Sequence, residues 1–113
     1  MDDNISPVMV YSTCPSVAVA EEIGGQLVEG GLSACVNILP GMIAIYSWQG
    51  ERQRDEEVVM IVKTRAGLAD RVVARIVELH PYEEPAAVVL PINGGSASFL
   101  AWVAEQTSAA AAK

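Results

Sequence analysis

Hydrophobic side chains occupy both faces of the stretch 34–48, the longest β-like segment of the chain. Before Pro40 and Gly41, one parity carries Val36 and Ile38, and the other carries Cys35, Asn37 and Leu39. After this dipeptide, the two sets are Met42, Ala44, Tyr46 and Trp48, and Ile43, Ile45 and Ser47. A strand with one face in water should alternate apolar with polar residues, so this strand needs cover on both sides. In a chain of 113 residues, we expect the second cover to come from another subunit.

The segment 56–63 is a second strand of the same kind. Its alternating positions are apolar on both sides, with Val58, Met60 and Val62 on one and Val59 and Ile61 on the other. Between the two strands, the polar segment 49–55 contains a glycine and is typical of a hairpin connection. The pattern predicts an antiparallel ribbon whose first arm is the longer. We expect the overhanging part of that arm to pair or pack on a neighbouring subunit.

A first amphipathic helix is predicted after a short strand at 8–12. Ser16 is its N-cap candidate, and Gly30 supplies a stop after apolar residues at helical spacing. Gly24 and Gly25 would each cost about 1 kcal/mol relative to alanine inside this helix. We therefore expect another element to pack closely against them.

The rest of the chain predicts a second helix and a last strand. Helical spacing covers 68–79, and Pro81 disfavours helical backbone at His80. A strand is predicted at 86–90, then an amphipathic segment that includes Trp102, while 108–113 is expected to fray. The order βαββαβ plus a short C-terminal helix predicts an α+β fold, a ferredoxin-like sandwich with an antiparallel sheet.

The composition agrees with one domain over 1–113, with a folded core at about 8–107. Hydrophobic residues make up 51% of the chain and the mean hydropathy is +0.31, which favours an oligomer. No apolar run approaches the roughly 18 residues of a membrane span, and the first residues show no secretory pattern, so we expect a cytoplasmic protein without a membrane partner. Because 14 acidic residues outweigh 7 basic ones, giving a net charge of −7, nucleic acid is not an expected partner.

The reactive side chains are few. Cys14 and Cys35 lack a Cys-x-x-Cys spacing, so we interpret both as free thiols, Cys14 in a loop beside Pro15. His80 is the single histidine of the chain. No arrangement of nucleophile, base and oxyanion hole is recognisable, and we do not expect an enzyme.

Ordered blocks of sequence carry a family resemblance. They are Ala34–Gly41 with Ile45–Gly50, Lys63–Arg65, His80–Pro85 and Leu100–Trp102. Together they resemble the CutA (CutA1) family of divalent-cation tolerance proteins. The resemblance extends from about Val8 to Trp102, nearly the whole chain.

The resemblance implies a ferredoxin-like subunit in a tight homotrimer, similar in build to the PII signalling proteins, with the long hairpin reaching across to neighbours. Family members are linked to tolerance of copper and other divalent metals, and some bind copper. No enzymatic activity is established for the family. We therefore expect no required cofactor, and Cu²⁺ or another divalent cation as the candidate ligand.

The chemically plausible metal ligands are Cys35, His80 and Glu83, with Glu84 as a further oxygen donor. The alternatives are a small buried side chain for Cys35 and a structural role at a helix end for His80. Enterobacterial members of the family use a cysteine and two successive histidines for copper. The corresponding positions here are Ser12, Leu79 and His80, so two of those three ligands are absent.

A second group of residues is predicted at an intersubunit pocket or interface: Tyr46, Trp48, Lys63, Tyr82, Glu84 and Trp102. Lys63 and Arg65 are expected to meet an anion or the acidic pair Glu83 and Glu84. Two functions therefore stay open. One is a trimeric divalent-cation tolerance protein with copper binding, and the other is a PII-like sensor that binds a small metabolite between subunits.

Overall fold

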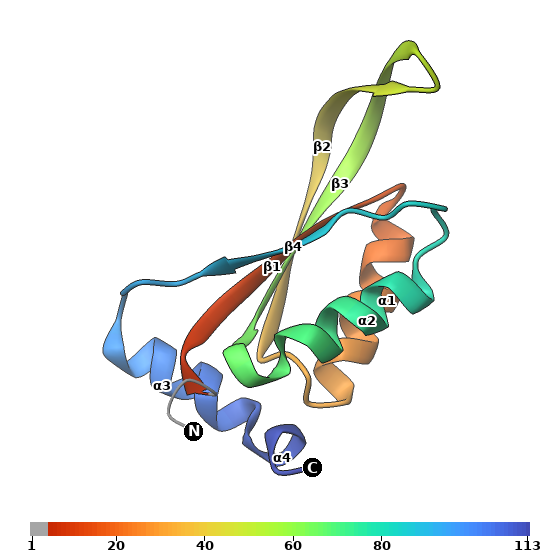
Figure 1. Ribbon diagram of the computed structural model, residues 1–113. Coiled ribbons are helices and arrows are strands. Elements are labelled where there is room, and N and C mark those ends of the chain that lie inside the picture. The colour runs from red at the N-terminus through yellow and green to blue at the C-terminus, as the bar shows by residue number, and fades with distance from the viewer. Residues whose placement is uncertain (1–4) are drawn as a thin grey trace.

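The computed structural model describes residues 5–113, and its elements follow the predicted order. Figure 1 shows a sheet with two helices beside it, a long hairpin that projects from the molecule, and further helices near the C-terminus. The elements are β1 (Pro7–Cys14), α1 (Val17–Glu29), β2 (Cys35–Trp48), β3 (Glu51–Arg65), a 3-10 turn (Ala66–Leu68), α2 (Ala69–Leu79), β4 (Ala87–Pro91), α3 (Ala97–Gln106) and α4 (Ser108–Ala111). The chain is thus an α+β protein.

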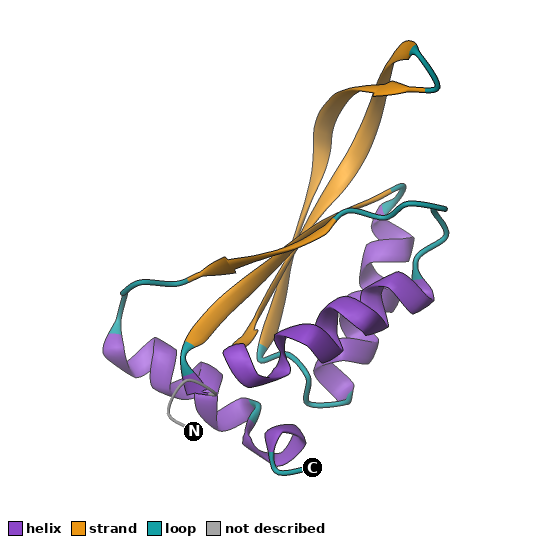
Figure 2. Cartoon of the chain, in the orientation of Figure 1, coloured by secondary structure: helices purple, strands orange, loops and turns teal. Residues whose placement is uncertain are grey.

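The sheet has four strands in the order β2-β3-β1-β4, and every neighbouring pair is antiparallel. Figure 2 shows α1 and α2 lying together on one side of these strands. The core lies between this helix pair and the sheet, and its members are buried side chains that include Val10, Ile23, Leu27, Met60 and Ile76. The apolar faces of the two helices and the apolar face of the sheet therefore pack together in one layer.

Local signals in the sequence set the ends of both core helices. Ser16 is the N-cap of α1, because its side chain accepts a hydrogen bond of 3.2 Å from the backbone N–H of Val19. At the end of α2, His80 has extended backbone angles (φ −77°, ψ 139°) immediately before Pro81, as predicted.

The two glycines of α1 differ in their surroundings. A Cβ on Gly24 would lie 3.0 Å from Cγ1 of Val36 in β2, whereas a Cβ on Gly25 would meet nothing within 4 Å. The expected close packing is confirmed for Gly24 only. It brings the helix backbone directly onto β2.

A β-bulge at Pro40 and Gly41 keeps β2 in register with β3. Leu39 pairs with Val59 and Met42 pairs with Glu57, so β2 contains one more residue than its partner between these pairs. Gly41 has φ +85°, a conformation that glycine adopts without strain. Because one residue is inserted, odd positions before the bulge and even positions after it lie on the same face.

The hairpin differs from its prediction. The segment 51–55, expected in the connection, is part of β3, and the turn consists of Gln49 and Gly50 with φ values of 53° and 82°. Two positive φ angles in a two-residue turn match the twist of the flanking strands. The two arms pair along their whole length to Trp48 and Glu51, so the predicted overhang of the first arm is wrong.

The segment 108–113, expected to fray, contains helix α4. Ala110 is 6% exposed, and its carbonyl accepts a hydrogen bond of 3.0 Å from Nη1 of Arg71 in α2. Cys14, expected in a loop, is the last residue of β1 and is fully buried. Both segments therefore belong to the packed domain.

The sheet face opposite α1 and α2 carries many apolar side chains, and we call it the open face. Its members alternate with the core residues along each strand and include Met9, Tyr11, Val59, Ile61, Val88 and Leu90. Val88 is 53% exposed and Leu90 41% exposed. Only α3, next to the end of β3, approaches this face among the described elements.

No described helix is long and apolar enough to cross a membrane.

Candidate functional site

A cavity of about 770 Å³ lies between the hairpin and the loop that joins α2 to β4, and we call it the hairpin cavity. The β2–β3 arm contributes Met42, Tyr46, Trp48, Asp55 and Glu57; the loop contributes Tyr82, Glu83 and Glu84; β1 contributes Tyr11 and Thr13. Strand pairing places the arm residues on one side, since Met42 lies opposite Glu57 and Ala44 opposite Asp55. The cavity therefore adjoins the open face.

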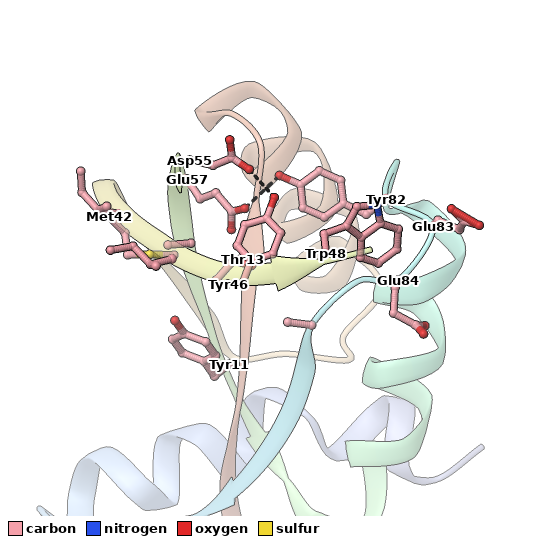
Figure 3. A pocket seen from close by; sticks show the side chains of 14 residues that line it. Tyr11, Thr13, Met42, Tyr46, Trp48, Asp55, Glu57, Tyr82, Glu83 and Glu84 are labelled. Carbon is pink, nitrogen blue, oxygen red and sulfur yellow. Dashed lines mark hydrogen bonds between the residues drawn. The ribbon is translucent and has the colours of Figure 1, made fainter. Parts of the chain in front are cut away.

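Two tyrosine–carboxylate pairs cross the cavity, as Figure 3 shows. The hydroxyl of Tyr46 donates to Oδ2 of Asp55, a diagonal neighbour on the adjacent strand. The hydroxyl of Tyr82 donates to Oε2 of Glu57 over 3.4 Å. The second pair joins the loop to β3, so the loop is held against the hairpin arm.

The surroundings of these tyrosines raise their pKa values. Burial, followed by the charge of Glu57 and the hydrogen bond to it, raises the pKa of Tyr82 to about 12. The hydrogen bond to Asp55 is the main cause of the raised pKa of Tyr46. The pKa of the Cys14 thiol is also raised, chiefly by burial and then by the charge of Glu57. The charge of Glu57 contributes to all three shifts, because a like charge nearby disfavours ionisation.

His80 is occupied by backbone hydrogen bonds at both ring nitrogens. Its Nδ1 accepts from the N–H of Tyr82 over 3.1 Å, and its Nε2 lies 2.7 Å from the carbonyl oxygen of Thr13. A carbonyl can only accept, which assigns the ring proton to Nε2. The ring is 7% exposed and lies 4.7 Å, centroid to centroid, from that of Tyr82. His80 thereby fixes the loop that carries Tyr82.

The predicted metal ligands do not gather in one place. Within residues 5–113, no group of three or more histidine, cysteine, aspartate or glutamate side chains is placed to hold a metal ion. Cys35 lies at the start of β2, opposite Lys63, whereas His80 contacts Thr13 and Glu83 lines the hairpin cavity. At the positions of the other enterobacterial ligands, the Ser12 hydroxyl donates to the Ala86 carbonyl over 2.6 Å and Leu79 packs against the core.

The predicted pocket residues divide into two groups. Tyr46, Trp48, Tyr82 and Glu84 line the hairpin cavity together. Lys63 and Trp102 lie instead near α3, where the Lys63 ammonium donates to Asn37 and lies 5.8 Å from the Phe99 ring centroid. Trp102 is the neighbour of Phe99 in α3, with ring centroids 5.8 Å apart. The structure therefore does not bring these two residues to the cavity.

Arg65 also differs from its prediction. It is buried, its Nε donates to the Thr107 hydroxyl over 3.0 Å, and its Nη2 donates to the carbonyl of Ala104. Both acceptors lie at the C-terminal end of α3. Arg65 thus anchors that helix, and the expected contact with Glu83 and Glu84 is wrong.

Sequence reasoning missed Asp55 and Glu57 as cavity residues. They appear there because the pairing register puts both carboxylates on the same face as Tyr46 and Trp48, and Asp55 belongs to the strand because β3 begins at Glu51 rather than at 56. The dipeptide Gln49-Gly50 was the available signal, since a glycine in a two-residue turn between strands favours a tight hairpin.

Comparison with known proteins identifies the family. The family model described as CutA1 divalent ion tolerance protein matches residues 8–106. The divalent-cation tolerance protein CutA of Thermus thermophilus is 44% identical over 99 residues, covering 88% of this chain and 96% of the relative. The chloroplastic protein CutA 1 of rice, Oryza sativa, is 35% identical over 103 residues, covering 91% of this chain. The chain belongs to the CutA1 family.

Solved structures agree with this assignment. The T. thermophilus structure matches with a TM-score of 0.86, covering 89% of this chain and 98% of that one. The structure of CutA from Xylella fastidiosa matches with a TM-score of 0.88 at 33% identity, covering 90% and 98%. The chain corresponds to 58% of the length of the rice relative, whereas it spans almost all of the bacterial one.

Proposed function

We propose that this protein acts as a homotrimeric divalent-cation tolerance protein, with a ferredoxin-like subunit and a PII-like assembly. The observation that carries the proposal is the open face, whose strands are apolar on the side that α1 and α2 do not cover. Family membership supports the link to divalent cations, since the T. thermophilus relative is named for tolerance of them.

Assembly through the open face follows from the hydrophobic effect. Burial of about 800 Å² of apolar surface per subunit would contribute roughly 20 kcal/mol before the costs of association. Val88 and Leu90 are about half exposed on this sheet face, so assembly through the face would remove their apolar surface from water. A closed ring needs two different complementary surfaces on each subunit, and the projecting hairpin supplies a surface distinct from the sheet.

We propose that metal binding draws ligands from more than one subunit. His80, Cys35 and Glu83 remain the candidate ligands, but a metal on His80 would have to displace the Tyr82 N–H from Nδ1 or the Thr13 carbonyl from Nε2. Carboxylates such as Glu83 and Glu84 are the exposed alternatives, and two subunits would bring more of them together.

Calorimetric titration with Cu²⁺ tests the assignment of His80. We expect His80→Gln to weaken binding at least tenfold, with Cys35→Ala as the matched test of the thiol. Unchanged Cu²⁺ binding in His80→Gln would remove His80 from the site. Sedimentation of each variant shows whether the substitution weakens metal binding directly or by disrupting assembly.

We also place the protein in the cytosol. Both cysteines of the described chain are free thiols, which suits a reducing compartment. The rice relative is named as chloroplastic, so location varies within the family. Fractionation of the source cells followed by immunoblotting would test the placement, and recovery outside the cytosol would contradict it.

A second candidate function is that of a sensor for a small metabolite. The hairpin cavity favours it, because its volume of about 770 Å³ lies within the range of ligand pockets and aromatic side chains form much of its wall. A thermal-shift screen with small metabolites, repeated with Cu²⁺, would separate the two candidates. Stabilisation by a metabolite and not by Cu²⁺ would favour the sensor.

A further inference from the structure

Glu57 is a buried carboxylate without a cationic partner. It is 8% exposed and lines the hairpin cavity. The only ion pair among residues 5–113 joins Arg75 to Glu78 in α2. The only hydrogen bond that the described residues give the carboxylate of Glu57 is the 3.4 Å contact from the neutral hydroxyl of Tyr82. A buried charge in this condition is costly, and a bound cation would offset the cost.

The charged residues that line the cavity all have one sign. Its lining includes the carboxylic residues Asp55, Glu57, Glu83 and Glu84 and contains no lysine or arginine. The raised pKa of Tyr82, to about 12, has the charge of Glu57 among its causes. An anionic ligand would meet repulsion here, and a cationic one attraction.

The walls between these carboxylates are aromatic and apolar. Tyr46, Trp48 and Tyr82 line the cavity, with Met42 and Ala44 on the same face of β2. Figure 3 shows Asp55 and Glu57 on one side of Tyr82 and Trp48, and Glu83 and Glu84 on the other. Aromatic faces attract organic ammonium groups and pack against methylene chains.

A bare metal ion fits this lining less well than an organic cation. No described group of side chains offers three ligands to a metal, and aromatic rings and a methionine thioether are not the oxygen ligands of hard divalent cations. The volume of about 770 Å³ also exceeds what one ion requires. A linear diamine carries two ammonium groups joined by an apolar chain, which suits a cavity with carboxylates on either side of an aromatic wall.

We propose that the hairpin cavity binds a linear aliphatic diamine or polyamine. One ammonium group pairs with Glu57, the methylene chain lies against Tyr46, Trp48 and Tyr82, and the second ammonium group faces Glu83 and Glu84. The inference deepens the small-metabolite candidate and rests on it, by naming the chemical class of the ligand.

The test is calorimetric titration of the full chain with 1,5-diaminopentane, with 1,5-pentanediol as the neutral probe. We expect saturable binding of the diamine, no binding of the diol, and at least a tenfold weaker affinity in Glu57→Gln. The matched control is Glu56→Gln, because Glu56 is the exposed neighbour in β3 and does not line the cavity. Its affinity should equal that of the wild type. Trp48→Leu should also weaken binding while the net charge stays the same.

Three outcomes would overturn the inference. Equal losses in Glu56→Gln and Glu57→Gln would mean general attraction to an acidic surface. Equal binding of the diol and the diamine would leave the small-metabolite candidate standing while the ammonium inference fails. Absence of diamine binding by the wild type, combined with loss of assembly in Glu57→Gln, would mean that a basic side chain of a second copy fills the cavity. Sedimentation in the same buffers reports the assembly separately.

Discussion

The two faces of strand β3 differ in what covers them. On one face, Val58, Met60, Val62 and Thr64 are buried beneath α1 and α2. On the other, the alternating residues are Glu57, Val59, Ile61 and Lys63, which belong in turn to the hairpin cavity, the open face and the surroundings of α3. The helix-covered face is packed within one chain, whereas the opposite face has apolar side chains that no described helix covers except near α3, and carboxylates that are hydrogen-bonded to neutral tyrosine hydroxyls.

The charged residues at the two ends of the opposite face differ in their partners. Near α3, Arg65 and Lys63 have partners within the chain, and Arg65 fixes the end of that helix. At the hairpin, Glu57 and the other carboxylates have no basic neighbour in the cavity lining. Charge at one end therefore stabilises the subunit, while charge at the other end is available for recognition.

The largest expected effect lies on the helix-covered face. Met60 is fully buried among core residues, so Met60→Ala should lower the free energy of unfolding by about 2–5 kcal/mol. The neighbour Ile61 on the open face is the matched position, and Ile61→Ala should weaken assembly more than it destabilises the subunit. Urea unfolding at one fixed protein concentration reports the stability of fold and assembly together, so sedimentation of the folded variants on dilution is needed to separate the two effects. If Met60→Ala and Ile61→Ala had equal effects on unfolding and equal effects on assembly, the two faces would not differ in role.

The next effect tests the part of the opposite face that α3 covers. Arg65→Ala should cost about 1–3 kcal/mol, because it removes the guanidinium hydrogen bonds to the buried Thr107 hydroxyl and to the Ala104 carbonyl. Loss of far-UV circular dichroism at a lower urea concentration would report it. Arg54→Ala, at an exposed hairpin position, is the control and should stay within about 0.5 kcal/mol of the wild type. An equal loss in the free energy of unfolding in both variants would contradict the anchoring role of Arg65.

A smaller effect concerns the close packing of α1 on β2. Gly25→Ala should stabilise the protein by about 0.5–1 kcal/mol, because its Cβ enters open space in a helix. Gly24→Ala should lose that gain or reverse it, because its Cβ would lie 3.0 Å from Val36. Thermal unfolding of the two variants checks this, and an equal gain at both positions would contradict the close approach.

The smallest effect is the alkaline titration of Tyr82. Its pKa is raised from 10.0 to about 12, so the unfolded chain loses this proton at lower pH than the folded one. The stability it contributes is therefore full below about pH 10 and is lost as the pH rises toward 12. The pKa of Tyr46 is raised as well, so Tyr82→Phe should remove one group from the late-titrating part of the tyrosinate absorbance and leave the rest. A Tyr82 that titrates near its ordinary pKa would contradict the contact with Glu57.

Much of the fold could be predicted, because local chemistry settles it. Ser16 as an N-cap and Pro81 after His80 mark helix ends that depend on adjacent residues alone. The need for cover on both faces of 34–48 could be read from side-chain alternation, but the extra residue at Pro40-Gly41 appears only in the pairing register. The length of the hairpin could not be predicted in this way, since strands that project into water need no apolar alternation and 51–55 therefore resembles a loop.

The candidate site was predicted less completely. Tyr46, Trp48, Tyr82 and Glu84 were predicted at an intersubunit pocket or interface, and within one chain they line the hairpin cavity together. Asp55 and Glu57 were missed because only the pairing register places them beside the aromatic residues. Lys63 and Trp102 were predicted at the same intersubunit pocket or interface, but within one chain Lys63 lies at the α3 end of the sheet and Trp102 is part of α3.

The central claim is that the open face is buried between subunits. Sedimentation equilibrium over a wide range of protein concentration tests it most directly. For a chain of 12.0 kDa, the account predicts a single species at three times that mass, about 36 kDa, that persists on dilution until the chains unfold. A stable, folded species of 12.0 kDa would contradict it.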